Sequence, residues 1–111
     1  MNLLCYCDYR MHDSTDNVPF KAYVQADEDL TRFWEAVDTA LEAVARGGDR
    51  KSAWHQFAKE MIPMRRTMYQ CPACGRIYLE DGKGDFHCFV PESGDVPKGL
   101  LRRDGGVEGV R

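Results

Sequence analysis

Apolar residues recur at intervals of three and four along residues 27–46 and again along residues 49–62. This spacing places them on one face of a helix, so the sequence predicts two amphipathic helices. The first helix should end at Gly47-Gly48 and the second at Pro63, because glycine and proline both interrupt helices. We expect the apolar faces to be buried against a sheet, with three aromatic side chains as core anchors: Trp34, Trp54 and Phe57.

The two predicted helices carry opposite charges. Residues 27–46 contain six carboxylates and two arginines, a net charge of −4, whereas residues 49–66 contain five basic and two acidic side chains, a net charge of +3. Helices of opposite sign joined by a short glycine turn favour an antiparallel hairpin whose edges attract each other. We therefore interpret the basic stretch as a hairpin edge rather than a nucleic-acid surface.

Short apolar or alternating stretches outside the helices predict strands over residues 3–7, 20–24, 67–70, 76–80 and 86–90. Residues 8–17 are polar and rich in turn-forming side chains, so they are predicted to be a loop. Alternation places Phe86, Cys88 and Val90 on the core face of the last strand. Tyr78, His87 and Phe89 are either covered by the rest of the chain or form an exposed aromatic patch, which would mark a binding surface.

Two close cysteine pairs stand near opposite ends of the chain. The segment Cys71-Pro72-Ala73-Cys74-Gly75 has the spacing of a metal knuckle, in which a tight turn directs two thiolates at one ion. Cys5 and Cys7 form the second pair. Four thiolates in two chelating pairs predict one structural zinc site with Cys5, Cys7, Cys71 and Cys74 as ligands.

Other ligands and another metal stay open at this point. Cys88, His87 and His12 could replace one of the N-terminal cysteines, although we interpret Cys88 as a core residue. Cys5 and Cys7 could instead be small buried residues of an apolar strand. A tetrahedral site of four sulfur atoms also accepts iron.

The fold class predicted from these elements is α+β: a small zinc-ribbon-like antiparallel sheet with a two-helix hairpin inserted between the two cysteine pairs. Residues 1–92 should form this domain. Residues 93–111 are rich in glycine and charged side chains, which predicts a flexible tail or one that docks through Leu100 and Leu101 or on a partner. In a chain of 111 residues apolar burial is limited, so a metal ion would add substantially to stability.

Composition limits the compartment and the chemistry. Five cysteines without a secretory leader predict a reducing cytoplasm rather than a disulfide scaffold, and no stretch approaches the length of a membrane span. We expect no enzyme, because four thiolates would fill the coordination shell of the ion. A redox role for Cys71 and Cys74 is disfavoured as well, because the knuckle leads into a predicted strand and not into a helix N-terminus.

Four segments together resemble a group of short uncharacterised bacterial zinc-ribbon proteins: Cys5–Cys7, Asp13–Tyr23, Tyr69–Arg76 and Phe89–Glu92. The resemblance spans roughly residues 3–92, with the helices as a variable middle. It implies a cytoplasmic bacterial protein with the four thiols of Cys5, Cys7, Cys71 and Cys74 as ligands. Small acidic proteins of this kind are often immunity partners of secreted toxins.

The function expected from the sequence is therefore a zinc-stabilised, non-enzymatic protein-binding module, most specifically an immunity-type protein that neutralises a toxin. A net charge of −3 and the acidic first helix fit a basic protein partner. The alternative is a nucleic-acid-binding zinc ribbon that uses Arg76, Tyr78, Lys83 and the basic second helix. A sequence pI near 5.6 disfavours this alternative. Contacts with phosphate groups dominate nucleic-acid binding, and a chain with a negative net charge repels them.

Overall fold

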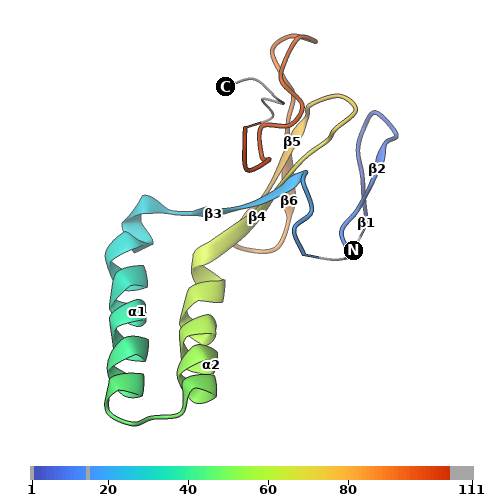
Figure 1. The fold of residues 1–111 in the computed structure, drawn as a ribbon. Helices are drawn as coiled ribbons and strands as arrows, with labels where there is room; N and C mark the ends of the chain where they lie inside the picture. Colours follow the sequence, from blue (N-terminus) through green and yellow to red (C-terminus); the bar gives the residue numbers. More distant parts are fainter. Residues whose placement is uncertain (1, 15, 106–111) are drawn as a thin grey trace. The chain divides into compact units, whose positions relative to one another are not determined.

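The structure is a computed structural model that describes residues 2–14 and 16–105. It is an α+β protein, as predicted, with two helices and antiparallel sheets (Figure 1). The chain divides into two compact units. We call residues up to Tyr23 together with those from Thr67 onward the sheet unit, and Val24–Arg66 the helix unit.

The strands described by the structure form two sheets. In the first, β1 (Asn2–Leu4) pairs with β2 (Arg10–His12), with Leu3 opposite Met11. The second is a sheet of four strands in the order β3-β4-β5-β6, in which Tyr69 lies opposite Tyr78 and Tyr78 opposite Cys88. Its strands are β3 (Lys21–Gln25), β4 (Arg65–Gln70), β5 (Ile77–Glu80) and β6 (Phe86–Phe89).

The N-terminal region differs from its prediction in two ways. The first strand ends at Leu4, and the segment that carries Cys5 and Cys7 is a turn instead of the second half of a strand. The predicted polar loop contains β2, which is held by pairing with β1 and by the burial of Met11. A three-residue strand with one apolar side chain is too short to produce a clear alternation in the sequence.

The helices lie close to where the sequence places them. A 3-10 turn over Asp27–Asp29 leads into α1 (Leu30–Ala45), and α2 (Arg50–Met61) is followed by a second 3-10 turn over Ile62–Met64. Asp49 caps α2, because its carboxylate accepts hydrogen bonds from the backbone N–H and the hydroxyl of Ser52, both at 2.9 Å. In Figure 1 α1 and α2 run side by side and are joined by a short turn. Between them the Phe33 and Phe57 rings meet edge to face.

Neither helix in the described part of the chain is long and apolar enough to cross a membrane.

The main buried cluster belongs to the sheet unit, whereas Ala53 is the one buried residue of α2. This cluster comprises Cys5, Met11, Tyr69, Cys71 and Tyr78, with Leu3, Phe20, Cys74, Phe86 and Cys88 packed around it. The expectation that Trp34 and Trp54 anchor a core between helices and sheet is wrong, because these side chains are 56% and 58% exposed. Phe57 is half-buried.

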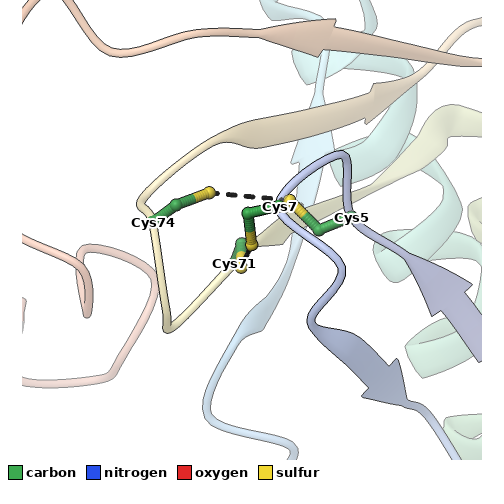
Figure 2. Close-up of side chains that lie close together, drawn as sticks. All are labelled: Cys5, Cys7, Cys71 and Cys74. Atoms are coloured by element: carbon green, nitrogen blue, oxygen red, sulfur yellow. Dashed lines mark hydrogen bonds between the residues drawn. The ribbon is translucent and has the colours of Figure 1, made fainter.

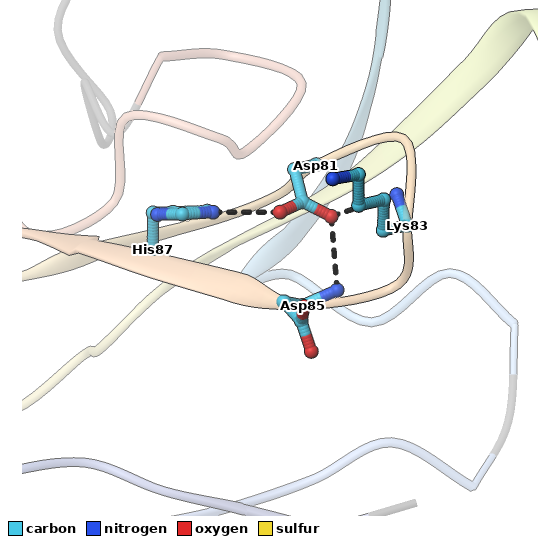
Figure 3. A network of polar contacts seen from close by, with 4 residues as sticks. All are labelled: Asp81, Lys83, Asp85 and His87. Atoms are coloured by element: carbon cyan, nitrogen blue, oxygen red, sulfur yellow. Dashed lines mark hydrogen bonds and ion pairs between the residues drawn. The ribbon is translucent and has the colours of Figure 1, made fainter.

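The turn between β5 and β6 is organised by one carboxylate, that of Asp81 (Figure 3). Its Oδ1 accepts the backbone N–H groups of Lys83 at 2.8 Å and Asp85 at 3.1 Å, and its Oδ2 lies 2.8 Å from Nε2 of His87. The contact with His87 lowers the pKa of Asp81, and the two backbone hydrogen bonds lower it further by smaller amounts. His87 is therefore a partner of this turn.

The C-terminal segment is tied to the sheet unit through Gln70. This side chain is fully buried and donates from Nε2 to the carbonyls of Pro97 at 2.8 Å and Gly75 at 3.3 Å, while its Oε1 accepts the backbone N–H of Leu100 at 2.8 Å. Docking therefore involves backbone groups near Leu100, whose own side chain is exposed. Residues 106–111 of the predicted tail lie outside the described residues.

Candidate metal centre

The N-terminal cysteine pair sits in the turn between β1 and β2. The backbone N–H of Cys5 donates to the carbonyl of Tyr9 at 2.9 Å, and the N–H of Asp8 donates to the carbonyl of Cys5 at 2.8 Å. Asp8 adopts a positive φ of 75°, which residues with short polar side chains tolerate best among those other than glycine. The turn brings the two thiols of this Cys-x-Cys pair closer together than an extended strand would, where they would be too far apart for one ion.

The C-terminal pair sits in the knuckle between β4 and β5. The N–H of Gly75 donates to the carbonyl of Cys71 at 2.8 Å, and the N–H of Cys71 donates to the carbonyl of Arg76 at 2.9 Å. Gly75 has a φ of +87°, and a Cβ at this position would lie only 2.6 Å from a methyl group of Val96. Both the backbone conformation and the available space therefore require glycine here.

The two turns bring the four predicted thiols together (Figure 2). The Sγ atoms of Cys5 and Cys74 are 3.5 Å apart, those of Cys7 and Cys71 are 3.6 Å apart, and all four lie within 4.8 Å of one another. Tetrahedral coordination with metal–sulfur bonds of about 2.3 Å requires sulfur–sulfur distances of roughly 3.8 Å. These four cysteines could hold a metal ion.

Two polar side chains donate hydrogen bonds to the cluster. The hydroxyl of Tyr78 donates to Sγ of Cys5 at 3.2 Å, and Nη1 of Arg76 donates to Sγ of Cys74 at 3.3 Å. Burial and the contact with Cys5 raise the pKa of Tyr78, so its hydroxyl keeps the proton that it donates. Four thiolates around a divalent cation leave a net charge of −2, which these donors would partly offset.

Burial and hydrogen bonding give the thiols different acidities. Burial raises the pKa of Cys71 to about 12. At Cys5, burial acts in the same direction, but hydrogen bonds from the backbone of Cys7 and the hydroxyl of Tyr78 outweigh it and lower the pKa to about 6. A divalent cation bound here would displace the proton that burial keeps on Cys71.

Comparison with known protein families places most of the chain in a family. Residues 1–93 match the model of a family described as a domain of unknown function, DUF8617. The chain belongs to the DUF8617 family. The matched residues include both cysteine turns. The curated proteins and the solved structures contain no match to this chain.

The alternative ligands of this DUF8617 chain lie elsewhere. Among the described residues the cluster consists of Cys5, Cys7, Cys71 and Cys74, and the other candidates are not part of it. Nδ1 of His12 lies 2.8 Å from Oδ1 of Asn2, and His87 contacts Asp81. Cys88 is partly buried against the core cluster, as alternation predicts for it and Phe86, but Val90 follows the end of β6 and is 68% exposed, so its predicted place on the core face is wrong.

The exposed patch considered from the sequence, Tyr78, His87 and Phe89, is made of partly different residues in the structure. Tyr78 is buried, and its hydroxyl accepts the backbone N–H of Tyr6 at 3.0 Å. The ring of Tyr6 stacks over Tyr78, with centroids 6.4 Å apart, and is itself 78% exposed. Phe89 and Val90 are also exposed and share one shallow depression with Tyr6, Arg76 and His87. We call Tyr6, Phe89 and Val90 the aromatic patch.

Sequence reasoning missed three residues that support the centre. Tyr78 and Arg76 donate hydrogen bonds to the sulfur atoms of Cys5 and Cys74, and Gln70 donates to the carbonyl of Gly75 in the knuckle. The positions of Arg76 and Gln70 directly beside the Cys71–Gly75 knuckle were the available signal. Tyr78 reaches Cys5 only through the fold, since 73 positions separate the two residues.

Proposed function

We propose that the four cysteines hold a structural Zn²⁺ ion and that the chain is a non-enzymatic protein-binding module. Zn²⁺ is the metal that best suits a tetrahedral set of four thiolates. The observation that supports the site is the sulfur cluster itself, formed by two turns that lie far apart in the sequence. The reduced thiols that such a site requires favour a cytoplasmic protein.

The arrangement of the two turns supports a zinc-ribbon-like classification of the sheet unit. Each turn joins two antiparallel strands and contributes two ligands: the first joins β1 to β2, and the second joins β4 to β5. Two hairpin turns that contribute two ligands each are the arrangement expected of a ribbon.

Catalysis by the ion is disfavoured because the four sulfur atoms would occupy every position of a tetrahedral shell. A catalytic zinc ion keeps one position open for water or substrate. Cys71 and Cys74 also lie between two strands, so the helix dipole that activates redox cysteines is missing from the knuckle.

The aromatic patch is the surface that we propose for partner binding. Tyr6 lies between the ligands Cys5 and Cys7, so a bound ion would fix the backbone that presents its ring. Tyrosine and phenylalanine anchor many protein interfaces, because they bury a large area with few rotatable bonds. Arg76 donates to Cys74 and Tyr78 is buried with its hydroxyl on Cys5, so two of the candidate residues for nucleic-acid binding contact the cysteine cluster instead.

The partner that we propose is a basic toxin, which makes the chain an immunity-type protein. The net charge of −3 supports a basic partner, since opposite net charges accelerate association.

Metal analysis of the purified chain tests the first part of the proposal. We expect one zinc per chain, a colourless protein, and loss of zinc in Cys71→Ala. Cys88→Ala is the matched control, because it removes a partly buried thiol outside the cluster and should retain the metal. A visible thiolate-to-iron absorption band would identify iron instead, and zinc retained by Cys71→Ala would contradict the assigned ligands.

Coexpression with the product of a neighbouring toxin-like gene tests the second part. We expect protection of the host cell and a purified complex that Tyr6→Ala and Phe89→Ala both weaken. Lys83→Ala, in the β5–β6 turn, is the control and should bind normally. The proposed partner would be wrong if the chain gave no protection, or if it bound RNA or DNA in a salt-dependent manner.

A further inference from the structure

The helix unit exposes an apolar seam along α1. Five apolar residues follow one another at intervals of four, three, four and three positions: Leu30, Trp34, Val37, Leu41 and Val44. In a helix this spacing produces a continuous stripe suited to packing against other helices. None of the sixteen residues of α1, all of them described, is buried, and Leu41 is 64% exposed.

The two sides of the helix pair differ sharply in chemistry. One groove is lined by apolar residues of both helices, among them Val37, Leu41, Val44, Trp54 and Phe57. We call it the apolar groove. The opposite groove is lined largely by polar and charged side chains, including Arg32, Glu35, Thr39, Gln56 and Glu60. A helix pair with one apolar and one polar side corresponds to half of a four-helix bundle, in which the apolar sides of two such pairs form the core.

We infer that the apolar groove binds a second copy of this chain, so that two helix units form a four-helix bundle. This interface is separate from the aromatic patch and from the metal centre, which both belong to the sheet unit. Trp34 and Trp54 would then be buried between copies, which accounts for two exposed tryptophans within one chain.

Charge favours a second copy as the occupant and also selects the symmetry. Helix α1 has three acidic side chains and one arginine, a net charge of −2, whereas α2 has three basic side chains and one glutamate, a net charge of +2. The surface is therefore complementary to itself. A twofold axis parallel to the helices places α1 of each copy on α2 of the other, so that acidic helices face basic ones.

The other face-to-face arrangement has its axis perpendicular to the helices and places α1 on α1. It would bring the two acidic helices together and is disfavoured by repulsion. In the favoured arrangement the glycine turns of both copies lie at the same end. Glu42 near the end of α1 then approaches Arg50 and Lys51 at the beginning of α2 in the second copy.

Sedimentation velocity of the full chain tests the interface. We expect a dimer at micromolar concentration and a monomer for Leu41→Glu, with a dissociation constant raised at least about 100-fold, because two carboxylates enter an apolar interface. Leu41 is exposed within one chain, so the variant should keep its fold and its metal. Thr39→Glu adds the same charge on the polar side of α1 and should remain dimeric.

A charge exchange tests the symmetry. Glu42→Lys and Lys51→Glu should each weaken the dimer by roughly tenfold, and the double variant should recover much of the loss. A parent chain that stays monomeric at 100 micromolar or above, or a dimer that Leu41→Glu leaves intact, would overturn the inference. A dimer that is indifferent to all three charge variants would overturn the antiparallel pairing of α1 with α2. Tyr6→Ala should leave the dimer unchanged, so failure here is distinct from failure of the proposed partner.

Discussion

The two units bury their side chains in different ways. In the sheet unit, the fully buried side chains surround the cysteine cluster, and two of them are themselves cysteines. In the described part of the helix unit only Ala53 and Met64 are buried, although its helices carry most of the long apolar stripes. The comparison shows that the unit with the longer apolar stripes is not the unit that buries more apolar side chains.

The difference indicates two sources of stability. A bound metal ion can supply the sheet unit with free energy that its small core does not. The helix unit has no such site among its described residues, and its two short helices bury little surface within one chain. Association of two helix units would add to that burial and so to the stability of the helices.

Metal removal should have the largest effect and should separate the units. A structural zinc ion contributes about 10–16 kcal/mol of apparent free energy in small domains, so a strong chelator should unfold the sheet unit. We expect amide protection to disappear in β4 and β5 while α1 and α2 retain theirs in the dimer, as measured by hydrogen exchange. Simultaneous loss of protection in both units would show that they form one cooperative structure.

Loss of Asp13 should have the next largest effect, confined to the sheet unit. Its carboxylate lies 2.8 Å from Nζ of Lys21 and accepts the hydroxyl of Tyr69. Asp13→Ala leaves a largely buried cation and a buried hydroxyl without this partner, and should reduce the free energy of unfolding by about 2–3 kcal/mol. Urea denaturation checks this, with exposed Asp16→Ala as the control; equal stabilities would show that the pair is solvated.

The same carboxylate gives a pH dependence. Burial raises the pKa of Asp13, but the hydrogen bonds from Lys21 and Tyr69 outweigh it, so the pKa lies below its usual value of about 3.9. A lowered pKa stabilises the folded chain above that usual value, and the contribution disappears as the pH falls through the folded-state pKa. The stability difference between parent and Asp13→Ala should therefore shrink below about pH 4. A constant difference down to pH 2 would contradict this assignment.

Gln70 should have a smaller, local effect. Gln70→Leu removes the hydrogen bonds to Pro97 and Leu100 and should loosen residues 97–100 from the knuckle. Trypsin should then cleave after Lys98 roughly ten times faster, since a lost pair of buried hydrogen bonds costs about 1–3 kcal/mol. The control Gln56→Leu changes an exposed glutamine of α2. Unchanged cleavage after Lys98 would show that other contacts hold the segment.

Trp54→Ala should have the smallest effect on a dissociated chain. A fully buried tryptophan would cost about 3–5 kcal/mol, but this one is exposed, so we expect less than about 1 kcal/mol at nanomolar concentration. The loss should grow with protein concentration as the dimer forms. A large loss at high dilution would mean that Trp54 is buried within one chain.

The sequence predicted the cysteine cluster better than the core. Short-range chemistry identifies the knuckle, because Pro72 and Gly75 accompany cysteines at a spacing that few other structures use. The helices were located for a similar reason, since Pro63 and Gly47 mark their ends. The contacts of Tyr78 with Cys5 and of Gln70 with Pro97 depend on long-range pairing, which leaves no local pattern.

The error about Trp34 and Trp54 has a physical origin. An apolar stripe shows that a helix face avoids water, but the stripe is the same whether that face meets a sheet or another chain. The β2 strand was missed for the reverse reason: it contains a buried residue but no apolar pattern. Met11 is one of the most deeply buried side chains, yet its neighbours Arg10 and His12 are polar, so three residues gave too little signal.

The thiols of Cys7 and Cys71 meet across 64 positions of chain, and the whole helix unit lies between them. The entropy of closing a flexible loop grows only with the logarithm of its length, by about 0.6 kcal/mol per doubling. An ion at this junction would therefore tolerate a longer, shorter or entirely different intervening segment at almost constant cost. The segment between Cys7 and Cys71 could therefore be exchanged for another fold while the two cysteine turns keep their positions around the ion.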